Sequence, residues 1–167
     1  MPRFLRYARC VDVILVRHAE AVDETLELRD LARHLTPHGR TQAKSLGDRL
    51  RWHDVEPTRL WTSPLVRSVQ TAELVAAGLG ATCQIEVVPG LAPGESARSL
   101  VAVIRALPAT EHVVLFGHEP GMSAIAALLV GAPDFDALDK CEAVRITDDR
   151  LRWRFAWNAE APAKPTE

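Results

Sequence analysis

The chain has 167 residues, a mass of 18.4 kDa and a formal net charge of −2, with 47% hydrophobic and 25% charged residues. This length and composition predict one globular domain and exclude a fibrous or low-complexity chain. The near-neutral charge and the pI of about 6.3 give no electrostatic reason to expect a nucleic-acid or anionic-membrane partner.

The terminal residues, the apolar runs and the cysteines of the sequence bear on localisation and cofactors. Residues 1–10, MPRFLRYARC, carry arginines that interrupt any apolar signal core, so we expect no leader there. The longest apolar run, residues 124–130, is too short to cross a bilayer. Three widely spaced cysteines include no CxxC pair, which indicates neither a disulfide framework nor a zinc site and favours the cytoplasm. We expect a monomer without metal or cofactor.

The first predicted element is a strand over residues 11–16, VDVILV. Its unbroken apolar run is typical of a strand that is covered on both faces. An arginine and a histidine, Arg17 and His18, follow it directly. Residues 23–33 are polar with weak periodicity, which predicts a loop or a short helix. A helix then begins clearly, since Thr36 can serve as the N-cap and the next residue is proline.

A second strand-to-helix unit repeats this pattern. A strand over residues 59–62 precedes a helix for which we expect Ser63 as the N-cap and the following proline as the first helical residue. Either Gly78 or Gly80 ends that helix. On this assignment Arg67 lies in the first turn, where it can reach back over the helix N-terminus.

The rest of the chain continues the alternation. It predicts strands over residues 84–88 and 112–116, helices over 97–107 and 121–130, and a terminal hairpin that turns at Asp148 and Asp149. We expect one domain over residues 1–157 and a disordered polar tail over 158–167. Alternating strands and helices indicate an α/β fold with three layers, α/β/α, around a mostly parallel sheet with a C-terminal hairpin.

Polar side chains follow three of the predicted strands. They are Arg17 with His18, Ser63 with Arg67, and His118 after a glycine. The carboxyl ends of parallel strands share one edge of a sheet, where ligands bind. Arginine forks and helix N-termini there suit phosphate oxygens. The sequence therefore predicts a phosphate site that includes the two arginines, His118 and Ser63, although Ser63 is also explained as a helix cap.

In this order the motifs resemble those of the histidine phosphatase superfamily, over residues 11–131. The stretches RHAEA, LTPHG, SPLVRSVQTAE and GHEPGMS are most similar to SixA-type protein phosphohistidine phosphatases. The resemblance implies a phosphoglycerate mutase-like fold and a metal-independent phosphatase. It implies that His18 attacks phosphorus and becomes phosphorylated, that Arg17 and Arg67 bind phosphoryl oxygens, and that His118 stabilises the transferring group. Adjacent guanidinium groups favour the neutral, nucleophilic form of a histidine.

The general acid departs from the superfamily pattern. Relatives that release alcohols carry a glutamate in the loop after the third strand, whereas PGLAPGES offers only Glu95, offset from the usual place. Glu20 and Glu119, each beside a catalytic histidine, are the other candidates. A further departure is Ala19, which stands where glycine is commonest.

The missing acid favours one substrate class. An imidazole leaving group has a conjugate acid with a pKa of about 6.5 and departs with little help, unlike an alkoxide. The sequence therefore favours phosphohistidine on a phosphorelay or phosphotransfer protein. A sugar phosphate or nucleotide is the alternative substrate, and a non-catalytic phosphoryl-binding module is the alternative class. Such a module would need no nucleophile, yet both histidines are present.

Overall fold

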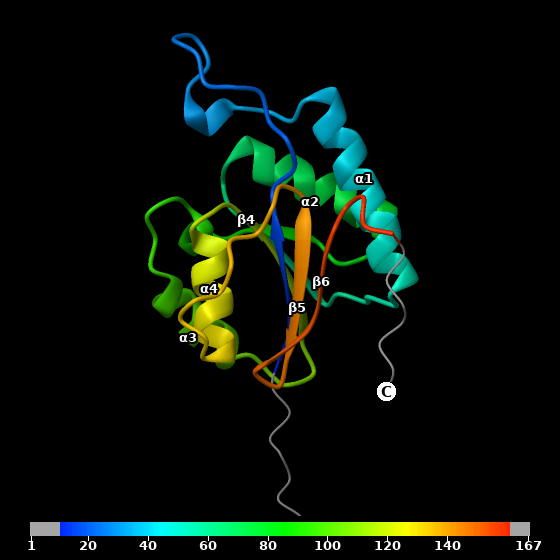
Figure 1. The fold of residues 1–167 in the computed structure, drawn as a ribbon, viewed down its shortest axis with the longest axis vertical. Coiled ribbons are helices and arrows are strands. Elements are labelled where there is room, and N and C mark those ends of the chain that lie inside the picture. The colour runs from blue at the N-terminus through cyan, green and yellow to red at the C-terminus, as the bar shows by residue number, and fades with distance from the viewer. Residues whose placement is uncertain (1–10, 161–167) are drawn as a thin grey trace, which may run out of the picture.

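The computed structural model describes residues 11–160, in which a six-stranded sheet lies between two pairs of helices (Figure 1). Helices α1 (Pro37–Trp52) and α2 (Val66–Leu79) pack on one face of the sheet. Helices α3 (Ala97–Arg105) and α4 (Gly121–Val130) cover the other face. The predicted three-layer α/β/α fold is confirmed.

The sheet has the strand order β3-β2-β4-β1-β5-β6. The strands are β1 (Asp12–Arg17), β2 (Arg59–Thr62), β3 (Ile85–Val87), β4 (His112–Gly117), β5 (Glu142–Thr147) and β6 (Arg150–Ala156). Strands β1 to β4 are parallel, and β5 and β6 form an antiparallel hairpin beside β1. The hairpin turns at Asp148 and Asp149, both at positive φ, as a type I′ hairpin loop requires. The mostly parallel sheet and the terminal hairpin are therefore confirmed.

Strand β1 is buried on both faces, which explains its unbroken apolar sequence. Val13 and Leu15 pack against the layer of α3 and α4, and Ile14 and Val16 against the layer of α1 and α2. All four side chains are at most 2% exposed. Since the strand is fixed from both sides, the residues that follow it emerge at a fixed point on the carboxyl edge of the sheet.

Helices α1 and α2 are in backbone contact through two glycines. A Cβ atom on Gly47 would lie 2.5 Å from the carbonyl oxygen of Val75 and 3.0 Å from the Cα atom of Gly78. Distances this short exclude any side chain at these positions without a shift of one helix. This contact sets the position of α2, which carries Arg67, relative to α1.

The start of α2 differs from the prediction. The helix begins at Val66 with Leu65 as its N-cap, so the expectation that Ser63 caps it is wrong. Ser63 instead extends the β2–β4 pairing, because its N–H donates to the carbonyl of Phe116 at 2.9 Å. The physical reason is this pairing with β4, which keeps Ser63 in the strand so that the helix begins only at Val66. Arg67 is therefore the second helical residue, and Gly80, in the left-handed region, ends the helix.

The other predicted elements lie close to their expected bounds. Thr36 caps α1 through a 2.9 Å bond from the N–H of Gly39, and the polar segment after β1 holds a 3₁₀ helix, η1 (Asp30–Ala32). No helix within residues 11–160 is long and apolar enough to cross a membrane. Residues 1–10, where we expected no leader, and residues 161–167 of the expected tail lie outside the described part of the chain.

Candidate active site

The carboxyl ends of β1, β2 and β4 meet at one point of the sheet edge. Arg17 pairs with Gly117 in the register of β1 and β4, and the N–H of His18 donates to the carbonyl of Gly117 at 2.9 Å. On the other side of β4, β2 ends at the same level, and the second residue of α2 is Arg67. The structure thus brings Arg17, His18, Arg67 and His118 to adjacent strand ends, as expected from the parallel sheet.

Two hydrogen bonds fix the His18 ring, which is only 7% exposed. Nδ1 lies 2.7 Å from the carbonyl oxygen of Ala19, and Nε2 lies 3.2 Å from Nε of Arg67. A carbonyl only accepts and a guanidinium only donates, so Nδ1 carries the proton and Nε2 presents its lone pair. The ring is therefore a neutral imidazole whose Nε2 atom faces an arginine.

The surroundings of His18 keep it neutral. Burial lowers its pKa most, and the charges of Arg67, Arg17 and His118 lower it further, against the opposing effect of the hydrogen bond to Ala19. The resulting pKa is about 4, compared with 6.5 for an ordinary histidine. At neutral pH the Nε2 lone pair is available for attack on an electrophile.

Arg67 is 5% exposed, and its guanidinium is held on several sides. Nη1 donates to the backbone carbonyl of Asp30 at 2.7 Å and lies 3.2 Å from Oδ1 of the same residue. Nη2 donates to Oδ2 of Asp30 at 3.3 Å. Nε is the group that faces His18. A residue of η1, 37 positions earlier in the chain, thus holds the arginine next to the candidate nucleophile.

Arg17 is fixed at one nitrogen and unpartnered at another. Its Nη1 donates to the carbonyl of Leu138 at 2.7 Å. Its Nε is buried and has no hydrogen-bond partner within the described residues. A buried donor without a partner costs free energy, and an anion oxygen would satisfy it. Arg17 is therefore oriented like a group that binds an anion.

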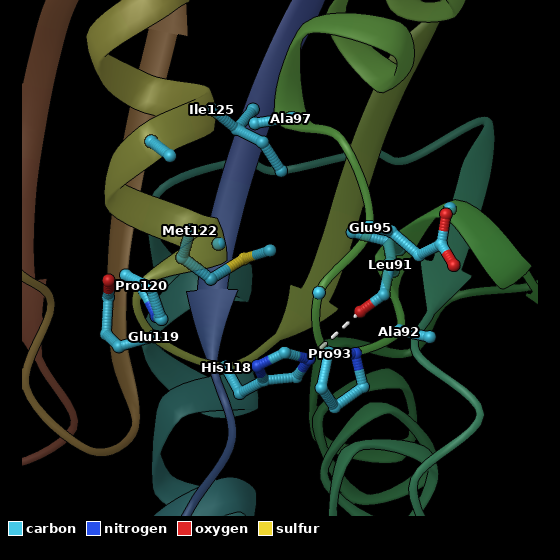
Figure 2. Close-up of a pocket in the computed structure, with 14 residues that line it drawn as sticks. Leu91, Ala92, Pro93, Glu95, Ala97, His118, Glu119, Pro120, Met122 and Ile125 are labelled. Carbon is cyan, nitrogen blue, oxygen red and sulfur yellow. Dashed lines mark hydrogen bonds between the residues drawn. The ribbon is translucent and has the colours of Figure 1, made fainter.

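His118 borders a cavity of about 340 Å³ (Figure 2). Its Nε2 lies 3.1 Å from the carbonyl oxygen of Leu91, so this nitrogen carries a proton and donates. The cavity is lined mostly by apolar residues of α3, α4 and the loop before α3; they include Leu91, Pro93, Ala97, Met122 and Ile125. His118 thus lines this cavity, whereas Arg17, His18 and Arg67 are not among its lining residues.

The three candidate acids occupy different positions. Glu20 Oε1 accepts a hydrogen bond from the hydroxyl of Thr36 at 2.6 Å. Glu119 accepts from the Ser123 hydroxyl at 2.5 Å and from the Leu138 N–H at 3.0 Å. Glu95 is exposed, and Figure 2 shows its carboxylate directed away from His118. None of the hydrogen bonds found within residues 11–160 joins these carboxylates to the four central residues.

Ser63 is fully buried, and its Oγ accepts from the N–H of Leu65 at 3.4 Å. Its hydroxyl therefore serves the turn between β2 and α2. Residues 11–160 contain no group of three His, Cys, Asp or Glu side chains that could hold a metal ion.

Sequence reasoning missed three groups at the site. Asp30 lies in a polar segment that gave no signal of a contact with Arg67. Leu138 acts through its backbone carbonyl, which no side-chain pattern reveals. Thr71 accepts from the N–H of Ala19 at 3.1 Å and donates to the Arg67 carbonyl at 2.7 Å. The spacing of four residues from Arg67 on one helix was the signal that could have found Thr71.

The fold and the strand-end arginines and histidines define a class, the α/β proteins of phosphoglycerate mutase-like fold. Residues 13–93 match the model of the histidine phosphatase superfamily (branch 1). An uncharacterised protein of Picosynechococcus sp. is 35% identical over 115 residues, which cover 67% of this chain and 68% of that protein. The chain belongs to the histidine phosphatase superfamily.

Solved structures with the same fold include two phosphatases. The protein histidine phosphatase SixA, complexed with tungstate, has a TM-score of 0.82 at 24% identity; the match covers 88% of this chain and 97% of SixA. A mycobacterial glucosyl-3-phosphoglycerate phosphatase, in complex with inorganic phosphate, has a TM-score of 0.65 at 21% identity, covering 91% and 99%. At these identities the likeness shows the fold.

Proposed function

We propose that the protein is a phosphatase that hydrolyses phosphohistidine on other proteins through a phosphorylated His18. The observation that carries this proposal is the state of His18 at the carboxyl edge of the sheet. Its Nε2 lone pair is free of a proton, and Arg67 lies 3.2 Å away. A neutral imidazole next to fixed guanidinium groups combines a nucleophile with donors for the oxygens of a phosphoryl group.

In the first step, Nε2 of His18 attacks phosphorus and forms a P–N bond. The P–N bond to the substrate imidazole breaks, and that imidazole leaves with the bonding electron pair and takes up a proton from solvent water. Arg17 Nε and Arg67 are the donors that would stabilise the negative charge on the phosphoryl oxygens. Since Nε2 of His118 donates to the carbonyl of Leu91, His118 would contribute through Nδ1 when that nitrogen also carries a proton. The hydrogen bond from Nδ1 to the carbonyl of Ala19 holds the ring in place and keeps the proton on Nδ1, so that Nε2 stays unprotonated.

In the second step, a water oxygen attacks the phosphorus of phosphorylated His18. The P–N bond to Nε2 breaks, its electron pair returns to the ring, and inorganic phosphate departs with the protons of the water. The low pKa of His18 supports this step, because a weakly basic imidazole is a good leaving group. The enzyme returns to its starting state.

The positions of the carboxylates support a phosphoramidate substrate. Glu20 and Glu119 are engaged by other groups, and Glu95 points away from His118. A phosphate ester would require a proton donor at the leaving oxygen, whereas a substrate imidazole leaves with little help. The high structural similarity to SixA, a protein histidine phosphatase, supports the same class.

A second candidate function is favoured by the cavity beside His118. Its volume of about 340 Å³ is at the lower end of the range for small-molecule sites. The leaving group of a small phosphate ester could occupy it, and one structural neighbour is a glucosyl-3-phosphoglycerate phosphatase. Its test is part of the same experiment.

The test is a substrate panel with the wild type, His18→Ala and His112→Ala. The control residue, His112, is an exposed histidine at the amino end of β4, away from the carboxyl edge. We expect a phosphohistidine protein to be turned over faster than phosphoserine, sugar phosphates and nucleotides. His18→Ala should abolish turnover, and His112→Ala should retain it.

Other outcomes identify the alternatives. Preferred turnover of a phosphate ester would support the small-molecule function. Phosphate binding without turnover of any substrate by the wild type would support a binding module. Full activity of His18→Ala would refute the proposed mechanism.

A further inference from the structure

We propose that Asp30 is a positioning residue, which holds Arg67 so that one edge of its guanidinium faces the phosphoryl group on His18. This inference rests on the proposed function, because it assigns Arg67 to the phosphoryl oxygens. Asp30 lies in the loop between β1 and α1, which projects beyond the carboxyl edge of the sheet (Figure 1).

The hydrogen bonds of Arg67 divide between two edges of its guanidinium. A guanidinium has five N–H groups in a planar fork. The carboxylate of Asp30 contacts Nη1 with one oxygen at 3.2 Å and Nη2 with the other at 3.3 Å. A carboxylate that reaches both terminal nitrogens occupies the end of the fork. The backbone carbonyl of Asp30 takes a further N–H of Nη1 at 2.7 Å.

The N–H groups that remain are those of Nε and the second one of Nη2, which lie side by side on the other edge of the fork. Nε donates to Nε2 of His18, the atom that bonds to phosphorus in the proposed mechanism. A phosphoryl group on that atom would therefore meet two parallel donors, the arrangement that binds phosphate best. Asp30 does not occupy this edge, so the substrate does not need to displace it.

Asp30 is itself fixed. Arg33 Nη1 contacts its carboxylate at 3.0 Å, and Arg33 Nε donates to the carbonyl of Val22 at 2.7 Å. Desolvation raises the pKa of Asp30, but bonds and charges from Arg33 and Arg67 outweigh it and lower the pKa overall. The carboxylate is therefore ionised and held from both sides. A fixed ligand on the far end of the fork limits rotation of the guanidinium, which is the condition for pre-organised catalysis.

The test compares Asp30→Asn, Asp30→Glu and Asp48→Asn, each with and without Arg67→Ala. Asp48 is a matched control, since it pairs with Arg51 at 3.2 Å on the exposed side of α1. With a phosphohistidine protein as substrate, we expect Asp30→Asn to lower kcat by about 10- to 100-fold, as loss of an orienting partner does. Asp30→Glu should retain more activity, and Asp48→Asn should match the wild type.

The double variants separate positioning from a direct role. If Asp30 acts through Arg67, Asp30→Asn has no further effect on kcat when Arg67 is already alanine. An equal loss of kcat in both backgrounds would overturn the proposal, and so would faster turnover by Asp30→Asn, which would make Asp30 a competitor of phosphate.

A second measurement does not depend on activity. The ¹⁵N relaxation of the Arg67 Nε–H group reports the rigidity of its side chain, and we expect Asp30→Asn to make this group mobile while Asp48→Asn does not. An equally rigid Nε–H group in Asp30→Asn would overturn the proposal even if the wild type hydrolysed no phosphohistidine. A different result is a wild type that hydrolyses no phosphohistidine while the Nε–H group becomes mobile in Asp30→Asn. That result would overturn only the proposed function.

Discussion

The neighbours of His18 set both its tautomer and its protonation state. The backbone carbonyl of Ala19 fixes the tautomer, and Arg67 faces the other ring nitrogen. Burial and the nearby positive charges remove the tendency to bind a second proton. In the proposed mechanism the same cations bind the phosphoryl group that His18 attacks, so one arrangement would serve both purposes.

The first prediction concerns the titration of His18. Because its pKa is about 4 in the folded protein, its ring should remain neutral through mildly acidic pH. Ring ¹H–¹⁵N NMR of the wild type, with His18→Asn to assign the signals, should give a midpoint near pH 4. A midpoint near the ordinary value of about 6.5 would contradict the burial and charge argument.

The lowered pKa of His18 also makes the stability of the fold depend on pH. The unfolded chain takes up a proton at His18 near pH 6.5 and the folded chain only near pH 4, so protonation favours unfolding between these values. The contribution of His18 is fully retained above about pH 6.5 and declines as the pH falls toward 4. Urea titrations of the wild type and His18→Asn should show a smaller loss of stability in the variant over this window.

The sequence was sufficient to predict which residues gather at the sheet edge, because each follows a strand of a parallel sheet. The prediction could not include Asp30, since an irregular loop has no periodicity that fixes its path. It could not include the carbonyl of Leu138, since backbone groups are the same at every position. The roles of the four central residues stay predictions until the His18 variants are measured.

At the scale of elements, the start of α1 is packed against the segment that follows His18. A Cβ atom on Gly39 would lie 2.0 Å from the carbonyl oxygen of Glu20. That carbonyl accepts from the N–H of Thr36 at 3.1 Å, and the Glu20 N–H donates to Gln42 Oε1 at 2.9 Å. The glycine of the LTPHG motif therefore allows the backbone contact that orients the residues after His18.

This contact gives the second prediction. Gly39→Ala should lower the free energy of unfolding by about 1–3 kcal/mol, as overpacking does, and should also reduce kcat because the backbone at Glu20 must shift. Urea unfolding and steady-state kinetics measure the two effects. For stability the control is Gly121→Ala, where the added Cβ meets no atom within 4 Å. Equal stability of the two alanine variants would contradict the packing argument.

Helix starts show what local sequence can and cannot predict. The N-cap of α1 was predicted correctly, because Thr36 precedes a proline at the first helical position. The same reasoning was wrong at Ser63, although a proline follows there too. The difference is tertiary, since Ser63 still pairs with β4 through its N–H, and the chain must complete the strand before it turns. A local pattern alone cannot show where a neighbouring strand ends.

At the scale of the whole molecule, Asp12 links neighbouring strands at the amino end of β1, on the edge of the sheet opposite the candidate site. Its carboxylate accepts from Arg145 at 2.7 and 3.0 Å, from Thr147 at 2.6 Å, and lies 3.0 Å from His112 Nδ1. These contacts connect β1 to β5 and to β4. Desolvation raises the pKa of Asp12, but the bonds and charge of Arg145, with those of Thr147 and His112, lower it overall.

The third prediction follows from the contacts that Asp12 makes with β4 and β5. Asp12→Asn should destabilise the fold by roughly 2 kcal/mol, or about 4–8 °C in Tm for a chain of this size, and should leave kcat unchanged. Since the folded pKa is depressed, the carboxylate stabilises the fold above its ordinary pKa of about 3.8, and this contribution declines as the pH falls below it. The difference in Tm between wild type and variant should therefore narrow in acid. A large loss of kcat would contradict the separation of stability from chemistry.

The bond from Arg17 to the carbonyl of Leu138 joins residues 121 positions apart. Leu138 is itself held by Glu119 through its N–H. During synthesis His18 emerges from the ribosome before Leu138, together with the arginine that precedes it. That arginine gains its partner only after the segment leading into the last hairpin has emerged. A nascent chain therefore carries Arg17 well before the carbonyl that orients its guanidinium has been made.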